Sequence, residues 1–421
     1  YAFAYGADAV YAGQPRYSLR VRENDFSKLN KLAEGISIAH ELGKKFYVAS
    51  NIAAHNDKVR SYLKDMADVI DMKPDAIIMS DPGLIMMVRE KWPEMPVHLS
   101  VQSNAVNYAT VKFWQKMGLE RIILSRELSL NEISEIRQEC PDVELEVFVH
   151  GALCIAYSGR CLLSGYMTHR DSNQGACTNS CRWKYQVHSA TQDDNGDIIP
   201  DRDTDGDVVL LQERGRPGEF LPAFEDEFGT YIMNSKDLRA VQHVRQLMEM
   251  GIESIKIEGR TKSCYYVART AQVYRQAIEN GMQGQDFDMS LMDDLEKLAS
   301  RGYTEGFYRR HPPAEFQNYE QGRSVSEKQQ FVGEVQSVDG DKLNIEVKNK
   351  FQVGDSLELM LATGYETFVL DQMENDKGQD MIVAPGSGHR VRIAASNLDL
   401  SRDIGKFGIL LRNFPDNKAA S

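Results

Sequence analysis

The sequence contains no long hydrophobic run and few cysteines. A membrane-spanning helix needs roughly 18 consecutive apolar residues, and no such stretch occurs in the 421 residues. The chain has no charged start followed by an apolar core, the mark of a secretory signal. Six cysteines are too few for a disulfide scaffold. We therefore expect a cytoplasmic globular protein without a membrane partner, and we expect some residues before Tyr1 to be missing.

Positive charge is also in deficit. Lysine and arginine number 49 against 62 acidic residues, which gives a formal net charge of −13. A bulk charge of this sign argues against a protein that coats nucleic acid. The deficit is largely local, because segment 184–229 carries twelve acidic and four basic residues. Segment 150–183 has three arginines and one aspartate, so its charge is compatible with a confined contact to RNA.

Short apolar runs alternate with amphipathic helical patterns at intervals of roughly 20 to 30 residues, which is typical of βα units with a parallel sheet. Strands are predicted at 8–12, 45–50, 76–79, 97–101, 121–124, 144–149, 231–233 and 254–257. Helices are predicted at 29–42, 58–70, 82–92, 107–117, 130–139, 237–250 and 265–280. Eight such strands predict a TIM-like (β/α)8 barrel, with a doubly wound open sheet as the alternative.

Polar residues follow most of these predicted strands. Asn51, Gln102, Arg126, His150 and Glu258 each come just after an apolar run. In a barrel the carboxyl ends of all strands meet at one mouth, so we expect these side chains to form a single site. The simpler interpretation, that polar residues merely end strands, stays open for each residue taken alone.

The βα pattern is interrupted in one place and then ends. The interruption at 151–230 is too long for an ordinary connection and is predicted to be a cysteine-rich and acidic insertion in a catalytic domain spanning 1–322. The remainder, 323–421, is predicted to be a small antiparallel β-barrel domain, because short alternating segments are separated by turn residues. Its strands are predicted at 331–338, 342–347, 356–360, 366–370, 381–384 and 390–393.

Four of the six cysteines, Cys154, Cys161, Cys177 and Cys181, lie in one glycine-rich segment. Thiolates are soft ligands that suit zinc or an iron–sulfur cluster. Structural zinc sites use cysteine pairs separated by about two to four residues, and only the second pair here has that spacing. An iron–sulfur cluster, of the 4Fe–4S type, is therefore favoured and zinc is the second choice. Structural or redox-active thiols are a third interpretation.

This segment resembles the signature of the peptidase U-thirty-two family, also called collagenase-like proteases. The signature E-x-F-x-x-G-A-[apolar]-C-x(4)-G-x-C-x-[apolar]-S is met from Glu146 to Ser164. The stretches YGADAVYAG, SDPG, HLSVQ, LSRELSL, MNSKDL and IKIEGR are also similar to the family. Within the family, the cysteine segment is most similar to a branch of bacterial tRNA hydroxylation proteins.

The resemblance implies an enzyme, a tRNA uridine 5-hydroxylase that forms 5-hydroxyuridine at the wobble position. It implies prephenate as co-substrate and an iron–sulfur cluster held by the four clustered cysteines, and an electron-donor protein would be a further partner. Guanidinium pairs bidentately with carboxylate, so arginines near the mouth are candidates for binding a dicarboxylate. Our catalytic candidates are His150, His169, Arg126 and Glu258. Our substrate-binding candidates are Arg20, Asn51, Gln102, Arg160 and Arg260.

Two other hypotheses stay open. The zinc-protease pattern H-E-x-x-H and the serine elbow G-x-S-x-G are both absent from the sequence, although these are common hydrolase motifs. A cysteine-dependent peptidase could still use His150 with Cys154. The third hypothesis is an iron–sulfur hydroxylase of another substrate, such as ribosomal RNA or a quinone precursor. An RNA substrate requires a positive surface. The candidates for it are Lys256, Arg260, Lys262, Arg269 and Arg275, together with the arginines from Arg160 to Arg182.

Overall fold

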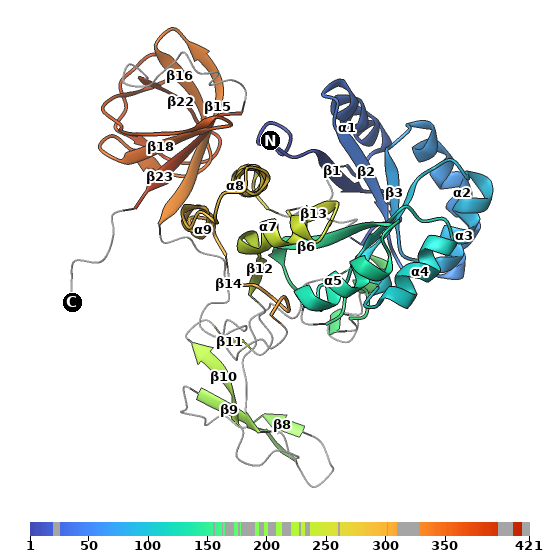
Figure 1. Cartoon of the computed structure of the whole chain (residues 1–421). Helices are drawn as coiled ribbons and strands as arrows, with labels where there is room; N and C mark the ends of the chain where they lie inside the picture. The colour runs from blue at the N-terminus through green and yellow to red at the C-terminus, as the bar shows by residue number, and fades with distance from the viewer. Residues whose placement is uncertain are drawn as a thin grey trace.

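The structure is a computed structural model. It describes residues 1–19, 26–154, 156–161, 163–164, 172–175, 177, 236–259, 262–300, 302–309, 328–394 and 407–414, together with the backbone of short strands between 190 and 231. These residues form a mixed α/β N-terminal unit and an antiparallel β unit near the C-terminus (Figure 1). No helix among them is both long and apolar enough to cross a membrane.

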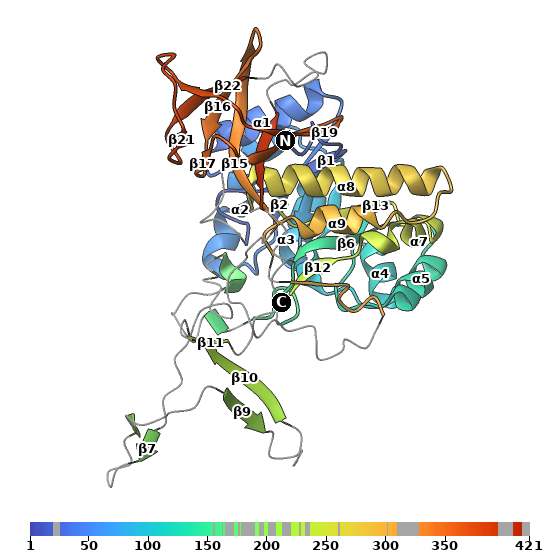
Figure 2. The same cartoon turned by 90° about the vertical axis from the view of Figure 1, so that its left-hand side faces the viewer.

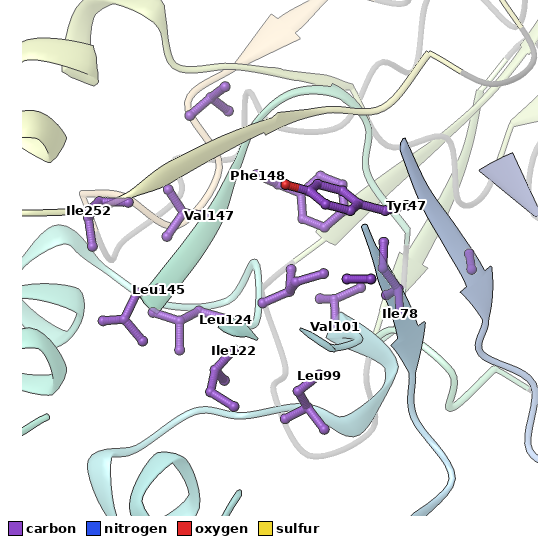
Figure 3. Packing of buried hydrophobic residues seen from close by; sticks show 14 of the residues in the cluster. Tyr47, Ile78, Leu99, Val101, Ile122, Leu124, Leu145, Val147, Phe148 and Ile252 are labelled. Carbon is purple, nitrogen blue, oxygen red and sulfur yellow. The ribbon is translucent and has the colours of Figure 1, made fainter. Parts of the chain in front are cut away.

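Six parallel strands form the centre of the N-terminal unit and pair in sequence order. Parallel strands are covered on both faces, so their residues are mostly apolar, and nearly all the residues of β2 to β6 are buried. Figure 3 shows Leu99, Ile122 and Leu145 among the side chains that fill this core. The strands are β1 (Ala9–Gly13), β2 (Lys45–Ser50), β3 (Ala76–Met79), β4 (Val97–Leu99), β5 (Arg121–Ile123) and β6 (Glu144–Ala152).

Five helices connect these strands and lie around their outer side (Figure 1). Short polar side chains start several of them: Asp81 accepts a hydrogen bond from the Leu84 amide, and Ser129 forms a capping box with Glu132. Such caps satisfy the free N–H groups of the first turn. The helices are α1 (Leu29–Glu41), α2 (Asn56–Asp71), α3 (Pro82–Lys91), α4 (Tyr108–Lys116) and α5 (Leu130–Glu139).

The sheet is open, and the predicted (β/α)8 barrel is not confirmed. Beyond β6 the sheet forks. The first part of β6 pairs in parallel with β13 (Ser254–Ile257), and its end pairs antiparallel with β12 (Asp237–Arg239). β12 continues to β14 (Tyr303–Thr304). Within the described strands no backbone ladder joins β13 to β1, so the strand order ends at β1.

Of the seventh predicted strand, 231–233, only Tyr231 belongs to the described residues. Tyr231 ends β11 (Gly229–Tyr231), which pairs with β10 (Phe220–Asp226), and β10 also pairs with β9 (Val208–Gln212). This three-stranded sheet lies apart from the parallel strands (Figure 2). The helix predicted at 237–250 begins instead as β12 and ends as α7 (Val244–Glu249). A short apolar run does not reveal whether it joins a local hairpin or a distant strand.

The C-terminal unit is an antiparallel sheet with the order β19-β18-β23-β15-β16-β22-β20. Its described strands do not close, so the predicted β-barrel is corrected to a sheet with its own apolar core. The prediction missed the interior strand β23 (Ile409–Asn413), whose buried Ile409, Leu410 and Leu411 form a continuous apolar run without alternation. The others are β15 (Gln329–Asp339), β16 (Lys342–Val347), β18 (Ser356–Leu361), β19 (Gly364–Val369), β20 (Met373–Asn375) and β22 (Arg390–Ala394), with β17 (Phe351–Gln352) and β21 (Val383–Ala384) as a separate pair.

Helix α8 (Cys264–Met282) joins the two units. Its Arg269 is 1% exposed and pairs with Glu358 of β18, which is also buried. Further along the helix, Arg275 pairs with Asp8. Arg269 therefore does not contribute to a positive RNA-binding surface as predicted, because its charge is buried in an ion pair. The charge of Arg275 is also paired.

Candidate active site at the strand ends

A pocket lies at the carboxyl ends of the parallel strands. Side chains within or just after β1 to β6 and β13 form its wall, as expected where parallel strands end together. Four of the predicted site residues, Asn51, Gln102, Arg126 and Glu258, line it. The complete lining is Tyr11, Ala49, Asn51, Ile78, Ser100, Val101, Gln102, Ile123, Arg126, Phe148, Lys256 and Glu258.

Side chains span the gap where the sheet is open. The Tyr11 hydroxyl of β1 donates a hydrogen bond to Glu258 Oε2 at 3.0 Å, just after β13. Lys256 Nζ lies 4.2 Å from the centre of the Tyr11 ring, within cation–π range. β1 and β13 are thus held together at the pocket by a phenol, a carboxylate and an ammonium group.

A buried charge network supports this wall. Glu146 Oε1 accepts from Lys256 Nζ at 2.7 Å, and Glu146 Oε2 accepts from Ser254 Oγ at 2.8 Å and pairs with Arg121 Nη1 at 3.3 Å. Burial alone would raise the pKa of Glu146, but the charges and hydrogen bonds of Lys256 and Arg121 outweigh it and hold the pKa at about 2. Lys256 is buried, so the prediction that it faces RNA from the surface was wrong.

Replacing Glu146 with glutamine is expected to lower the free energy of unfolding by about 3–5 kcal/mol, because Lys256 would keep a buried charge without a counter-charge and Arg121 would keep only the half-exposed Glu144 as its partner. Denaturant titration of the purified protein measures this effect. Glu144→Gln is the matched control: Glu144 also pairs with Arg121, but its side chain is 49% exposed, so a change below about 1 kcal/mol is expected.

The same network predicts a pH dependence. The folded pKa of Glu146, about 2, lies below its ordinary value of 4.5. Its contribution to stability is therefore fully present above pH 4.5 and is lost as the pH falls toward 2. The stability difference between wild type and Glu146→Gln should shrink over this range. A difference that is independent of pH between 5 and 2 would contradict the assignment.

Amide and hydroxyl groups form the opposite wall. Asn51 Nδ2 donates to Gln102 Oε1 at 3.0 Å and to Ser100 Oγ at 3.2 Å, and the Ser100 hydroxyl also donates to Gln102. The Leu19 amide donates to Asn51 Oδ1 at 3.3 Å. These bonds fix both amide planes and leave Gln102 Nε2 without an acceptor in the described part of the chain. This wall therefore offers a positioned hydrogen-bond donor to a ligand.

Arg126 supplies a positive charge to the pocket. Its guanidinium carbon lies 3.9 Å from the centre of the Phe148 ring, and Nη1 donates to the Ala152 carbonyl at 3.4 Å. No carboxylate in the described segments forms an ion pair with it. A stacked guanidinium with free N–H groups is suited to a planar anion such as a carboxylate.

The position of Glu258 depends on a close backbone approach. Gly151 at the end of β6 has φ +113°, and a Cβ built there would lie 2.4 Å from the Glu258 carbonyl oxygen. The Glu258 amide donates to the His150 carbonyl at 2.9 Å. Only glycine tolerates both this φ and this contact, so the glycine of the family signature sets where Glu258 stands.

His150 lies under helix α8 and is not part of the pocket wall. It is 1% exposed, and its ring packs against Tyr266, Tyr274 and Tyr303 at centroid distances of 5.5 to 5.6 Å. Burial lowers the pKa of His150 to about 3. The imidazole is therefore neutral at physiological pH.

The described cysteines of the segment lie near the same strand ends. Cys154 comes two residues after β6, and the Cys161 carbonyl accepts hydrogen bonds from Ser172 and Asn173. The Asn173 carbonyl in turn accepts from the Ala53 amide, just beyond β2, at 3.1 Å. This chain of contacts places the backbone at Cys161 beside the carboxyl end of β2.

The described thiols have the chemistry of a metal centre. Cys154 and Cys177 are exposed, and Cys161 is half-buried. Thiolates suit iron or zinc. However, no three cysteine, histidine or acidic side chains of the described residues are grouped closely enough to hold a metal ion. Cys181, the fourth predicted ligand, lies outside the described residues.

Three other candidates, Arg20, His169 and Arg260, also lie outside the described residues. Arg160 is exposed and lies beside Gln102, which its neighbour Gly159 contacts. The sequence analysis did not assign Tyr11 or Lys256 to the pocket. Each is a polar residue inside an apolar run, DAVYA for Tyr11 and SIKI for Lys256. Polar groups inside buried strands are rare unless they are paired, so these two residues could have been predicted to make specific contacts.

Comparisons with known proteins agree with the sequence signature. The description Peptidase family U32 matches residues 1–318, and the Peptidase family U32 C-terminal domain matches 327–410. The tRNA hydroxylation protein P of Escherichia coli is 59% identical over 98% of this chain and 94% of its own length. The protein of the same name from Haemophilus influenzae is 57% identical over 98% of this chain and 93% of its own length.

A more distant relative has a different substrate in its name. The 23S rRNA 5-hydroxycytidine synthase of Escherichia coli is 30% identical over 86% of this chain and 50% of its own length. Two relatives are therefore named for hydroxylation of tRNA and one for synthesis of a hydroxylated pyrimidine in ribosomal RNA. From the family matches along both units, the chain belongs to the Peptidase family U32.

Proposed function

We propose that this protein is a tRNA uridine 5-hydroxylase of the cytoplasm that forms 5-hydroxyuridine at the wobble position. The observation that carries the proposal is 59% identity to a tRNA hydroxylation protein along nearly the whole chain. The pocket at the strand ends supports it, because four polar residues predicted to form one site line that pocket. Both the fold and the relatives are consistent with one catalytic site in the N-terminal unit.

The pocket has the chemistry to receive a pyrimidine base. Ile78, Val101 and Ile123 provide apolar surface, and Gln102 provides an amide beside it. A base in an anticodon loop must leave its stack to reach a site at the bottom of a pocket. We place the uracil ring against the apolar surface, with its hydrogen-bonding edge toward Gln102.

The reaction replaces the hydrogen on C5 of uracil with a hydroxyl group. This oxidation needs an oxygen donor and electron transfer, which protein side chains supply poorly, and an iron–sulfur cluster bound by Cys154, Cys161, Cys177 and Cys181 would supply redox chemistry here. Glu258 is the group in the pocket suited to accept the proton that leaves C5. The Tyr11 hydroxyl, 3.0 Å away, holds the Glu258 carboxylate in place.

Arg126 is our candidate for binding the co-substrate prephenate. Prephenate carries two carboxylates, and guanidinium binds carboxylate through two parallel hydrogen bonds. The stacking of Arg126 on Phe148 fixes the plane of the guanidinium, so an anion bound there has a defined orientation. An electron-donor protein completes the set of partners that we propose.

The peptidase alternative is less well supported by the structure. A nucleophile and its base need to be within hydrogen-bond reach, but His150 is 1% exposed and neutral while Cys154 is exposed. An rRNA substrate remains the stronger alternative, because a relative at 30% identity is named for rRNA. Its match covers only 50% of that relative.

The experiment that separates these activities is nucleoside mass spectrometry. The chain is expressed in a bacterial strain that lacks its own U32-family hydroxylases, and tRNA and rRNA are digested separately. We expect 5-hydroxyuridine to return in tRNA and 5-hydroxycytidine to remain absent from rRNA. The reverse pattern would support the rRNA alternative, and casein cleavage by the purified protein without either nucleoside would support a peptidase.

Gly151→Ala is expected to reduce tRNA hydroxylation about 100-fold, because a displacement of roughly 1 Å at a catalytic group can cost that much. The added methyl group would collide with the Glu258 carbonyl. Gly43→Ala is the matched control, since Gly43 also has positive φ, +65°, but nothing lies within 4 Å of the added Cβ. Equal activity of the two variants at equal protein levels would show that the Gly151 contact does not position Glu258.

A further inference from the structure

We propose that Tyr157 and Arg160 form a docking site for the nucleotide next to the modified base. We call these two residues the rim platform. The Tyr157 ring stacks on a neighbouring base of the anticodon loop, and Arg160 binds the adjoining phosphate. The proposal rests on the proposed function, since it names the surface that would hold the rest of the loop while one base enters the pocket. It concerns residues that do not line the pocket.

The turn that carries the platform is fixed against the pocket wall. Asn104 Nδ2 donates to the Gln102 carbonyl and to the Ser158 carbonyl, both at 2.9 Å. Gly159 has φ +70°, and a Cβ there would lie 3.0 Å from the Gln102 side chain. The backbone of this turn therefore lies directly on a residue that lines the pocket.

The turn buries its middle and exposes its two larger side chains. The Arg160 amide donates to the Tyr157 carbonyl at 3.1 Å, which closes the turn. Ser158 between them is 5% exposed, whereas Tyr157 is 50% exposed and Arg160 is exposed. No acidic residue of the described segments pairs with the Arg160 guanidinium. The turn thus exposes an aromatic ring and a guanidinium, three residues apart, beside a residue that lines the pocket.

This pair matches the chemistry of single-stranded RNA. Every base has a π-face, so an exposed aromatic ring binds unstacked bases with little sequence preference. Arginine contacts to phosphate fix the register of a nucleic acid. When one base leaves the anticodon stack, its neighbour loses a stacking partner, and Tyr157 would replace that partner. A small carboxylate ligand would need Arg160 but would gain nothing from Tyr157.

The test measures binding of an anticodon stem-loop RNA to the full-length protein by fluorescence anisotropy over a series of salt concentrations. Tyr157→Ala is expected to weaken binding roughly 5- to 100-fold, as for loss of one stacked base. Tyr157→Phe and Tyr157→Trp should bind like wild type. Arg160→Gln should weaken binding and reduce the salt slope by about 1, as for loss of one phosphate contact.

Helix α4 provides matched controls. Phe113 is 53% exposed and Lys116 is exposed, at the end of α4 that leads into β5 and is therefore far from the carboxyl ends of the strands. Phe113→Ala and Lys116→Gln should leave RNA binding unchanged. If circular dichroism shows that Tyr157→Ala is poorly folded, Tyr157→Ser is used in its place. Its RNA binding is then compared with that of Tyr157→Phe, which keeps the aromatic ring.

The outcomes separate this proposal from the proposed function. If wild type binds the stem-loop and Tyr157→Ala and Arg160→Gln bind equally well, the rim platform is disproved while tRNA hydroxylation stands. If Arg160→Gln alone weakens binding, stacking by Tyr157 is disproved. If wild type neither binds the stem-loop nor modifies tRNA in cells, the proposed function itself fails.

Discussion

Replacing Cys154 with serine is expected to remove bound iron and abolish formation of 5-hydroxyuridine. A serine hydroxyl is a hard and weakly acidic ligand that replaces a thiolate poorly at an iron–sulfur centre. We expect the anaerobically purified wild type to be brown, with absorbance near about 400 nm and roughly four irons per chain. The variant should lose the colour, the iron and the modified nucleoside together, and Cys177→Ser should behave in the same way.

The matched control is Cys140→Ser. Cys140 is a free cysteine outside the clustered segment, buried at the end of α5, and its replacement should preserve both colour and iron. Metal analysis also distinguishes the zinc alternative, which would give a colourless protein with about one zinc per chain. A Cys154→Ser protein that keeps the iron content and activity of wild type would contradict the cluster assignment.

Replacing Glu258 with glutamine is expected to reduce the rate of hydroxylation by about 100- to 10,000-fold, the usual contribution of a positioned general base. Glutamine keeps the shape of the side chain and can still accept a hydrogen bond from Tyr11, but it cannot take up a proton from C5. The loss should appear in turnover, while binding of the stem-loop RNA and iron content should stay at wild-type values. Single-turnover assays with equal amounts of protein measure it.

Tyr11→Phe is expected to reduce the rate of hydroxylation less than Glu258→Gln does, because the Glu258 carboxylate remains present. The Tyr11 hydroxyl orients Glu258 through one hydrogen bond, so its removal should cost less than removal of the base itself. If Tyr11→Phe and Glu258→Gln reduce the rate equally, Glu258 is not the proton acceptor.

The sequence predicted the parallel strands and several pocket residues for a physical reason. The run AIIM is apolar throughout and KFYVAS is apolar between its first and last residues, so both were assigned as buried strands, and β2 and β3 have the predicted bounds. Residues that end parallel strands must share one edge of the sheet. Asn51, Gln102 and Glu258 could therefore be grouped before any contact between them was known.

The fork at β6 could not be predicted from the sequence. β12 lies beside β6 in the antiparallel direction, but its three residues carry no signal of strand direction. The placement of His150 was equally inaccessible. Its position four residues before Cys154 suggested a catalytic histidine. Its environment in the structure consists instead of tyrosines from α8 and β14, which are more than 100 residues away in the sequence. Such long-range packing leaves no local pattern.

The most direct test of the account is to map the anticodon loop by oligonucleotide mass spectrometry, in tRNA from the strain without hydroxylases. With the wild-type chain, we predict a mass increase of one oxygen atom at the wobble uridine. With Glu258→Gln the increase should be absent. It should be retained with Glu127→Gln, a carboxylate near the same strand ends that does not line the pocket. Full modification by Glu258→Gln, or oxygen added at another position, would contradict the claim that the wobble base reacts in this pocket.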